Sequence, residues 1–140
     1  MRLNVPAETV DRVRSSLDRC CTDKTFFQRF YARFLLTSDE VRQRFQGVDM
    51  RRQESVLRAS LYLVLRAASG LEEGLDHLAD IGRSHSRKGY DIRPPHYEHW
   101  LESLLRVVRE TDREYDDEIG RAWEAVLRPC IDQISRQADR

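Results

Sequence analysis

Leu75-Asp-His-Leu-Ala-Asp-Ile-Gly-Arg-Ser-His85-Ser-Arg-Lys-Gly89, followed by Ile92-Arg-Pro-Pro-His-Tyr97, is the most informative stretch of this chain. Leu75, Leu78 and Ile81 recur at helical spacing, so His85 projects from the same apolar face about one turn later. A histidine on an apolar face is usually a hydrogen-bonded core or boundary residue. The same position also suits an imidazole that ligates a metal, and the rest of the chain decides between the two interpretations.

The rest of the sequence favours helices throughout. No alternating run of β-branched residues extends beyond a few positions, and no Asn-Gly or Asp-Gly pair joins two such runs. We therefore predict an all-α fold. The 140 residues are the size of one domain, so we expect residues 1–140 to form a single domain.

Capping residues and prolines predict where the helices begin and end. The first helix starts after Asn4, with a proline near its first turn, and the second starts near Asp23 or Lys24. A capping pattern at Thr37 or Ser38 predicts a short helix that leads to Phe45. A long helix is then expected over about residues 49–68, ended by Ser69-Gly70.

The C-terminal half is expected to hold three further helices. The helix that carries His85 is predicted to end at Gly89, and Pro94-Pro95 opens the next one. Asp112 to Asp117 is predicted to be a charged connection. Pro129 should kink or break the last helix, because proline removes a backbone hydrogen bond.

Charge and cysteine content argue against several classes of function. Lys plus Arg and Asp plus Glu both number 24, so neither nucleic acid nor an anionic membrane is an expected partner. The sequence shows no signal peptide and no membrane span, and we expect a cytoplasmic protein. Cys20, Cys21 and Cys130 match neither a disulfide framework nor a zinc site, so reduced thiols are expected.

Four short motifs follow one another in a specific order: Phe30-Tyr31-x-x-Phe34, Glu40-Val-Arg-x-x-Phe45, Ile81-x-x-x-His85 and His96-Tyr97-x-x-Trp100. On these motifs, the chain from Phe26 to about Ile131 resembles the bacterial single-domain globins, which are related to the haem domains of flavohaemoglobins and of globin-coupled sensors. The resemblance implies a globin fold whose helices pack around a pocket for haem b, iron protoporphyrin IX.

The resemblance assigns one side of the haem to His85 and its neighbours. His85 matches the proximal histidine, whose Nε2 is the axial ligand of the iron. Tyr97 matches the tyrosine that approaches this histidine from the next helix. The remaining expected contacts on this side are an apolar wall of Ile92 and Trp100 and propionate partners among Arg87, Lys88 and Arg93.

One family feature is missing from the sequence. In flavohaemoglobins a glutamate of the last helix acts with the tyrosine to polarise the proximal imidazole, which favours oxygen chemistry over reversible binding. After Glu124 the last helix has no glutamate at the matching place. This departure weakens the case for peroxidase-like or dioxygenase activity.

On the other side of the haem, Tyr31 matches the distal tyrosine, whose hydroxyl can donate a hydrogen bond to bound dioxygen. Phe45 matches the phenylalanine that packs against the porphyrin plane. The long helix fits the family in two registers. One places Gln53 at the entrance with Leu57 and Leu61 over the haem, and the other places Val56 at the entrance with Leu57 and Ser60 inward.

Three other histidines have no assigned role in the predicted site. His77 lies too far along its helix to share an iron with His85, while His96 and His99 are expected at the surface or boundary.

The resemblance leaves three functions open: reversible binding of dioxygen and other diatomic gases for storage, transport or sensing; nitric oxide dioxygenation with a separate reductase; and a sensor or interaction module acting on a partner protein. A homodimer through the helices that hold Trp100 or Trp123 is a further expectation.

Overall fold

The computed structural model describes residues 3, 5–86 and 89–138, and within these ranges it contains seven helices and no strand. The prediction of an all-α fold is therefore confirmed. The helices are α1 (Ala7–Cys21), α2 (Phe26–Phe34), α3 (Asp39–Arg44), α4 (Met50–Ala68), α5 (Glu72–Ser84), α6 (Pro94–Thr111) and α7 (Asp117–Ala138). None of the helices in the described ranges is both long and apolar enough to cross a membrane.

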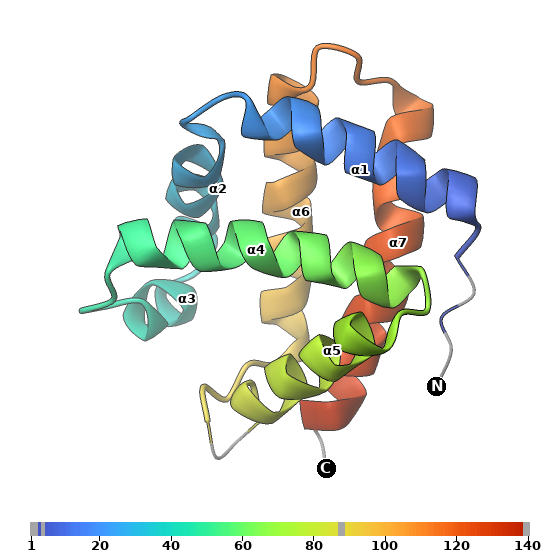
Figure 1. Ribbon diagram of the computed structural model, residues 1–140. Coiled ribbons are helices and arrows are strands. Elements are labelled where there is room, and N and C mark those ends of the chain that lie inside the picture. Colours follow the sequence, from blue (N-terminus) through green and yellow to red (C-terminus); the bar gives the residue numbers. More distant parts are fainter. Residues whose placement is uncertain (1–2, 4, 87–88, 139–140) are drawn as a thin grey trace.

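Two layers of crossed helices form the core. α6 and α7 run side by side, and α1 and α4 cross in front of them, with α2 and α3 at one end and α5 below α4 (Figure 1). α2 contributes the densest part of the core, because its five aromatic residues are all buried: Phe26, Phe27, Phe30, Tyr31 and Phe34. This aromatic face packs against α6 and α4.

Two glycines let α5, the helix that leads to His85, lie close to its neighbours. A Cβ atom at Gly74 would overlap the backbone of Ala67 in α4, and a Cβ at Gly82 would overlap the side chain of Gln137 in α7. Both positions are buried. Close packing on two sides therefore holds α5 in place.

Several helix boundaries differ from the sequence predictions. α2 begins at Phe26, because the Asp23 carboxylate accepts hydrogen bonds from the Thr25 amide and hydroxyl and holds residues 23–25 in a turn. α5 ends at Ser84 and not at Gly89, and His85 is its C-cap residue. The Tyr90 amide donates to the Ser84 carbonyl, so the chain turns back on the helix end.

The last helix is not broken at Pro129. α7 continues from Asp117 through Pro129 to Ala138. The backbone hydrogen bond that proline cannot donate would go to the carbonyl of Ala125, an exposed residue, where water can replace the missing donor. The helical ladder therefore loses one bond without a break.

The connection before α7 is charged, as predicted, but Asp112 within it is buried. Its carboxylate accepts hydrogen bonds from Ser16 Oγ at 2.6 Å, from Arg19 Nε at 2.6 Å and from the Glu114 amide at 3.0 Å. Trp123 Nε1 donates to Ser16 Oγ at 2.9 Å. This network joins α1 to the end of α6 and to α7. Burial alone would raise the pKa of Asp112, but the hydrogen bonds from Arg19 and Ser16 outweigh it and lower the pKa.

We predict that Asp112→Asn lowers the free energy of unfolding by about 3 kcal/mol at neutral pH, because Arg19 loses its buried carboxylate partner. The folded pKa of Asp112 is below the unfolded value of about 3.9, so the carboxylate stabilises the fold above that value and the stabilisation is lost as the pH falls through the folded pKa. Urea denaturation should show a difference between wild type and variant that shrinks in acid. Asp132→Asn, at an exposed site in α7, is the control, and an equal loss in both variants would refute the prediction.

Candidate functional site

His85 occupies the end of α5, where backbone bonds hold it on both sides. Its amide donates to the Ile81 carbonyl at 2.9 Å, and its carbonyl accepts from the Ile92 amide at 2.9 Å. The imidazole Nδ1 lies 3.3 Å from Tyr97 Oη, and the Tyr90 ring lies beside it with the ring centroids 6.5 Å apart. Tyr90, in the connection between α5 and α6, and Tyr97, in the first turn of α6, thus both lie beside the His85 imidazole.

The His85 ring is a neutral base at physiological pH. Burial lowers its pKa to about 4, because the charged form is poorly solvated there. When the neutral ring carries its proton on Nδ1, it donates to Tyr97 Oη and leaves the lone pair on Nε2. Nε2 has no hydrogen-bond partner among the residues that the structure describes. A neutral imidazole with one engaged and one available nitrogen is the form that binds a metal.

Tyr31 and Gln53 form a polar pair in otherwise apolar surroundings. Gln53 Nε2 donates to Tyr31 Oη at 3.2 Å, and burial raises the pKa of Tyr31 to about 12. The phenol therefore stays protonated. Since Oη accepts from Gln53, its own hydrogen remains available, and no acceptor for it occurs in the described part of the chain. The pair can donate one hydrogen bond to a small ligand.

An aromatic cluster lies around Tyr31. The Phe45 ring is half-buried at the end of α3, with its centroid 5.7 Å from that of Tyr31 and 6.1 Å from that of Phe34. On α6, Trp100 meets Phe30 edge to face at 6.0 Å. Phe45 and Trp100, like Ile92, are only partly buried and keep apolar surface available to a flat apolar group.

The contact of Gln53 favours the first of the two registers of the long helix. Gln53 contacts Tyr31, as the first register expects, and Leu57 and Leu61 are buried. Val56, which the second register places at the entrance, is 51% exposed. Ser60 Oγ lies 2.7 Å from His77 Nε2 and therefore faces α5, in a half-buried pair between the two helices.

Of the three basic residues expected near the haem edge, the structure describes only Arg93. Arg87 and Lys88 lie outside the described residues. Arg93 is exposed and pairs with Asp91 at 3.2 Å. His99 is half-buried, as expected for a boundary residue. His96 is buried, so the expectation that it lies at the surface or boundary is wrong. Its Nδ1 accepts from the Arg93 amide and its Nε2 lies 2.9 Å from Glu40 Oε2.

Sequence reasoning did not find the partners that α3 supplies. Arg44 Nε donates to the Tyr90 carbonyl at 3.1 Å, and Arg44 Nη2 donates to the Asp91 carbonyl at 2.9 Å. In sequence, Glu40 and Arg44 are four residues apart on a short helix, a pattern typical of an exposed ion pair. Only the packing of α3 beside the 90–92 segment and the start of α6 gives Arg44 and Glu40 these further partners.

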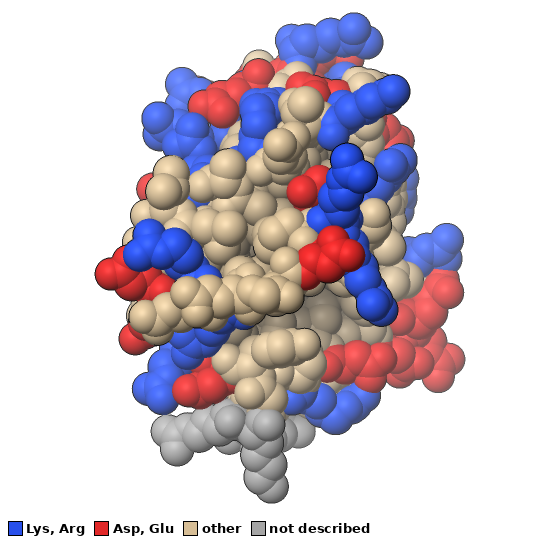
Figure 2. Space-filling view, turned by 90° about the vertical axis from the view of Figure 1, so that its left-hand side faces the viewer, with Lys and Arg blue, Asp and Glu red and all other residues tan. Residues whose placement is uncertain are grey.

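The face over α2, α3 and the start of α4 is largely uncharged at its centre. Figure 2 shows charged side chains toward the edges of this face and a hollow below its middle. Leu36 and Val48, in the connections before and after α3, are exposed apolar residues. This end of the molecule therefore offers a largely uncharged, hollowed surface over the elements that carry Tyr31 and Phe45.

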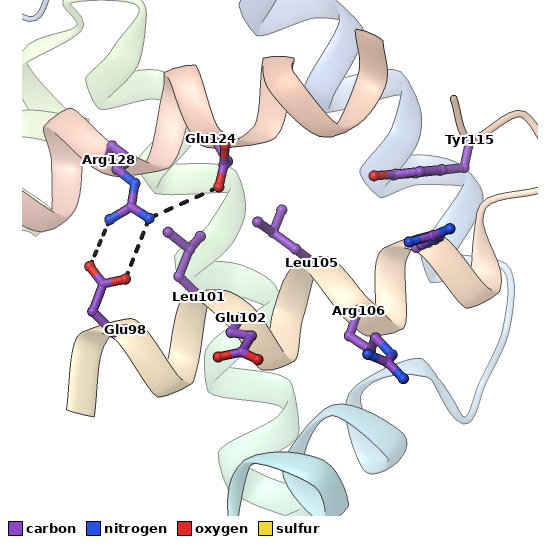
Figure 3. Close-up of a pocket in the computed structure, with 9 residues that line it drawn as sticks. Glu98, Leu101, Glu102, Leu105, Arg106, Tyr115, Glu124 and Arg128 are labelled. Carbon is purple, nitrogen blue, oxygen red and sulfur yellow. Dashed lines mark hydrogen bonds and ion pairs between the residues drawn. The ribbon is translucent and has the colours of Figure 1, made fainter. Parts of the chain in front are cut away.

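A separate groove of about 340 Å³ runs between α6 and α7 (Figure 3). Arg128 pairs there with Glu98 at 2.6 Å and with Glu124 at 4.0 Å, and Tyr115 lies near the other end. These charges satisfy one another, and the groove contains neither His85 nor Tyr31. We therefore place the candidate site at His85 and not in this groove.

The register can be tested with single cysteines. Val56→Cys is expected to react with a hydrophilic thiol reagent in the native protein, whereas Leu57→Cys, at an 8% exposed site, should react roughly tenfold more slowly because it needs local opening. Labelling is followed by mass spectrometry, with the wild type as the blank for Cys21, the half-buried native cysteine. Equal rates at positions 56 and 57 would contradict this placement of α4.

Comparisons with known proteins agree with the motifs and the fold. No protein-family model and no curated protein sequence matches the chain. A solved structure does: the protein PA3967 of Pseudomonas aeruginosa PAO1, described as structurally highly homologous to a human hemoglobin, is 38% identical, with a TM-score of 0.90. The match covers 94% of this chain and 99% of that protein. With this similarity over nearly its whole length, the chain has the globin fold and belongs to the bacterial single-domain globins.

Proposed function

We propose that this globin binds haem through His85 and uses it to bind dioxygen, and with it nitric oxide and carbon monoxide, reversibly. The observation that carries the proposal is the His85 imidazole, which is neutral, held at Nδ1 by Tyr97 and available at Nε2. The similarity to a protein described as homologous to a hemoglobin supports it.

The residues present fit haem b. His85 Nε2 would hold the haem iron, and Tyr97 would fix the tautomer and the orientation of the ring. The apolar residues that would contact the porphyrin are Phe45, Leu57, Leu61, Ile92 and Trp100. Haem iron supplies, when bound in the ferrous state, a centre that takes up diatomic gases.

Tyr31 and Gln53 would act on the gas. The Tyr31 hydroxyl would donate a hydrogen bond to dioxygen, which would carry partial negative charge in the pocket. Gln53 orients that hydroxyl, because its amide already occupies one acceptor position on Oη. Buried apolar neighbours such as Phe30 and Phe34 keep water from competing for the bond. We expect the protein to act in the cytoplasm, in oxygen binding, storage or sensing.

The first test is the visible absorption spectrum of the purified protein, ferric and then reduced under air and under carbon monoxide. We expect a haem band that shifts with each gas. His85→Ala should lose or alter this band because the side chain that would hold the haem iron is removed, while His99→Ala, a half-buried histidine of α6, should keep it. If the wild type takes up no haem even after reconstitution, the proposed function is wrong.

A second test concerns Tyr31. Tyr31→Phe is expected to speed dioxygen release about tenfold, since one hydrogen bond to the ligand contributes about 1.4 kcal/mol. Stopped-flow displacement of dioxygen by carbon monoxide measures the rate. Tyr62→Phe is the matched control, because Tyr62 lies on α4 but bonds Asp18 of α1. An unchanged rate in Tyr31→Phe would remove Tyr31 from the ligand site.

A further inference from the structure

The short helix α3 contacts both chain segments that touch the His85 imidazole. Its two contacting side chains, Glu40 and Arg44, lie one helical turn apart, with Arg44 Nη1 3.8 Å from Glu40 Oε2. We call these two residues the α3 clamp. Within the described residues, neither Glu40 nor Arg44 forms a hydrogen bond or ion pair with His85. Any effect on the imidazole is therefore transmitted through other residues.

Arg44 holds the segment after His85 by its backbone. Its guanidinium donates to two consecutive carbonyls, those of Tyr90 and Asp91, at 3.1 and 2.9 Å. Asp91 has a φ of 51°, a conformation that costs energy for a residue other than glycine and that persists when neighbouring contacts hold it. The fork of Arg44 supplies such contacts to the peptide carbonyls on both sides of this residue.

The held segment bears directly on His85. The Ile92 amide donates to the His85 carbonyl, and the Tyr90 amide donates to the Ser84 carbonyl at 2.8 Å. The Tyr90 ring stands edge to face beside the imidazole. A shift of the backbone at residues 90 and 91 would therefore move the C-cap of α5 and the ring that it carries.

Glu40 holds the second segment, the start of α6. The Arg93 amide donates to His96 Nδ1 at 3.0 Å, so the proton of the neutral His96 ring is on Nε2, which donates to Glu40. His96 is buried and is followed directly by Tyr97, the residue that contacts His85 Nδ1. Glu40 thus anchors the first turn of the helix that orients the imidazole.

The same helix leads into the other half of the site. Phe45 follows Arg44 directly and packs against Tyr31 and Phe34. α3 therefore connects the two sides of the site: Phe45 packs on the Tyr31 side, and the hydrogen bonds of Glu40 and Arg44 reach the His85 side.

We propose that the α3 clamp positions the proximal histidine: Glu40 and Arg44 set the orientation of the His85 ring through the 90–92 segment and the first turn of α6. This inference rests on the proposed function. An ordinary surface ion pair contributes little to stability. Arg44 differs from such a residue, because its side chain is 24% exposed and it bonds the backbone of a segment more than forty residues away. Arg42, on the same helix, is 57% exposed, and within the described ranges its one ion pair is with Asp39.

The test compares the haem-loaded wild type with Arg44→Ala, Arg44→Lys and Arg42→Ala. In Arg44→Ala we expect the iron–histidine stretching band of the ferrous protein, measured by resonance Raman spectroscopy, to shift or broaden. Haem transfer to an excess of a haem-free acceptor globin should be about tenfold faster, the usual size of an effect on a ligand's supporting partners. Arg44→Lys should fall between wild type and Arg44→Ala, because lysine keeps the charge but not the fork. Arg42→Ala should match the wild type.

Hydrogen exchange gives a readout that does not need the metal. The Tyr90 and Ile92 amides should exchange several times faster in Arg44→Ala than in Arg42→Ala, in the protein as purified. Circular dichroism shows whether each variant is folded. If Arg44→Ala does not fold, Arg44→Lys is compared with Arg42→Ala instead.

Two results would overturn the proposal. An unchanged iron–histidine band in a folded Arg44→Ala variant would show that Arg44 does not position His85, even if haem is lost faster. Equal exchange at residues 90 and 92 in all variants would show that the clamp does not hold the segment. Failure of the wild type to take up haem is a different result, independent of residue 44, and would overturn the proposed function and the role of the clamp together.

Discussion

A neutral imidazole in an apolar environment is the constraint on which the rest of this site depends. Burial keeps His85 uncharged, and Tyr97 engages only one of its nitrogens. α5 cannot aim the ring alone, because the helix ends at Ser84 and the ring belongs to its C-cap residue. The orientation must come from outside the helix, from α6 through Tyr97 and from the segment that folds back on the helix end.

The packing of the surrounding helices fixes the elements that orient the His85 ring. Gly74 and Gly82 let α5 pack closely against α4 and α7, so the helix that leads to His85 has little freedom to slide. At the opposite end of α6, the buried Asp112 network joins α1 to α6 and α7. The two ends of α6 are thus held by polar contacts, and its middle is held by packing against the aromatic face of α2.

On the Tyr31 side of the site, a buried phenol has a single polar partner. The aromatic residues of α2 bury one phenol among apolar neighbours, and a single amide, that of Gln53, reaches it from α4. A hydrogen-bond donor in such surroundings is stronger than the same group in water, because no solvent competes for it. α3 then links the two sides, since Phe45 packs on the aromatic cluster while Glu40 and Arg44 contact the segments around His85.

The sequence by itself determined the all-α fold and the order of the helices, because helical periodicity and caps are local properties of the chain. His85, Tyr31 and Tyr97 were singled out by motifs that resemble those of bacterial single-domain globins. The sequence left the register of α4 open, since Gln53 and Val56 lie three residues apart on a helix and both suit an inward face. Only packing against α2 decided that Gln53 faces Tyr31 and that Val56 faces solvent. The burial of His96 and Asp112 and the contacts of Arg44 were also decided by the tertiary structure, because each depends on a partner at least forty residues away that no local pattern marks.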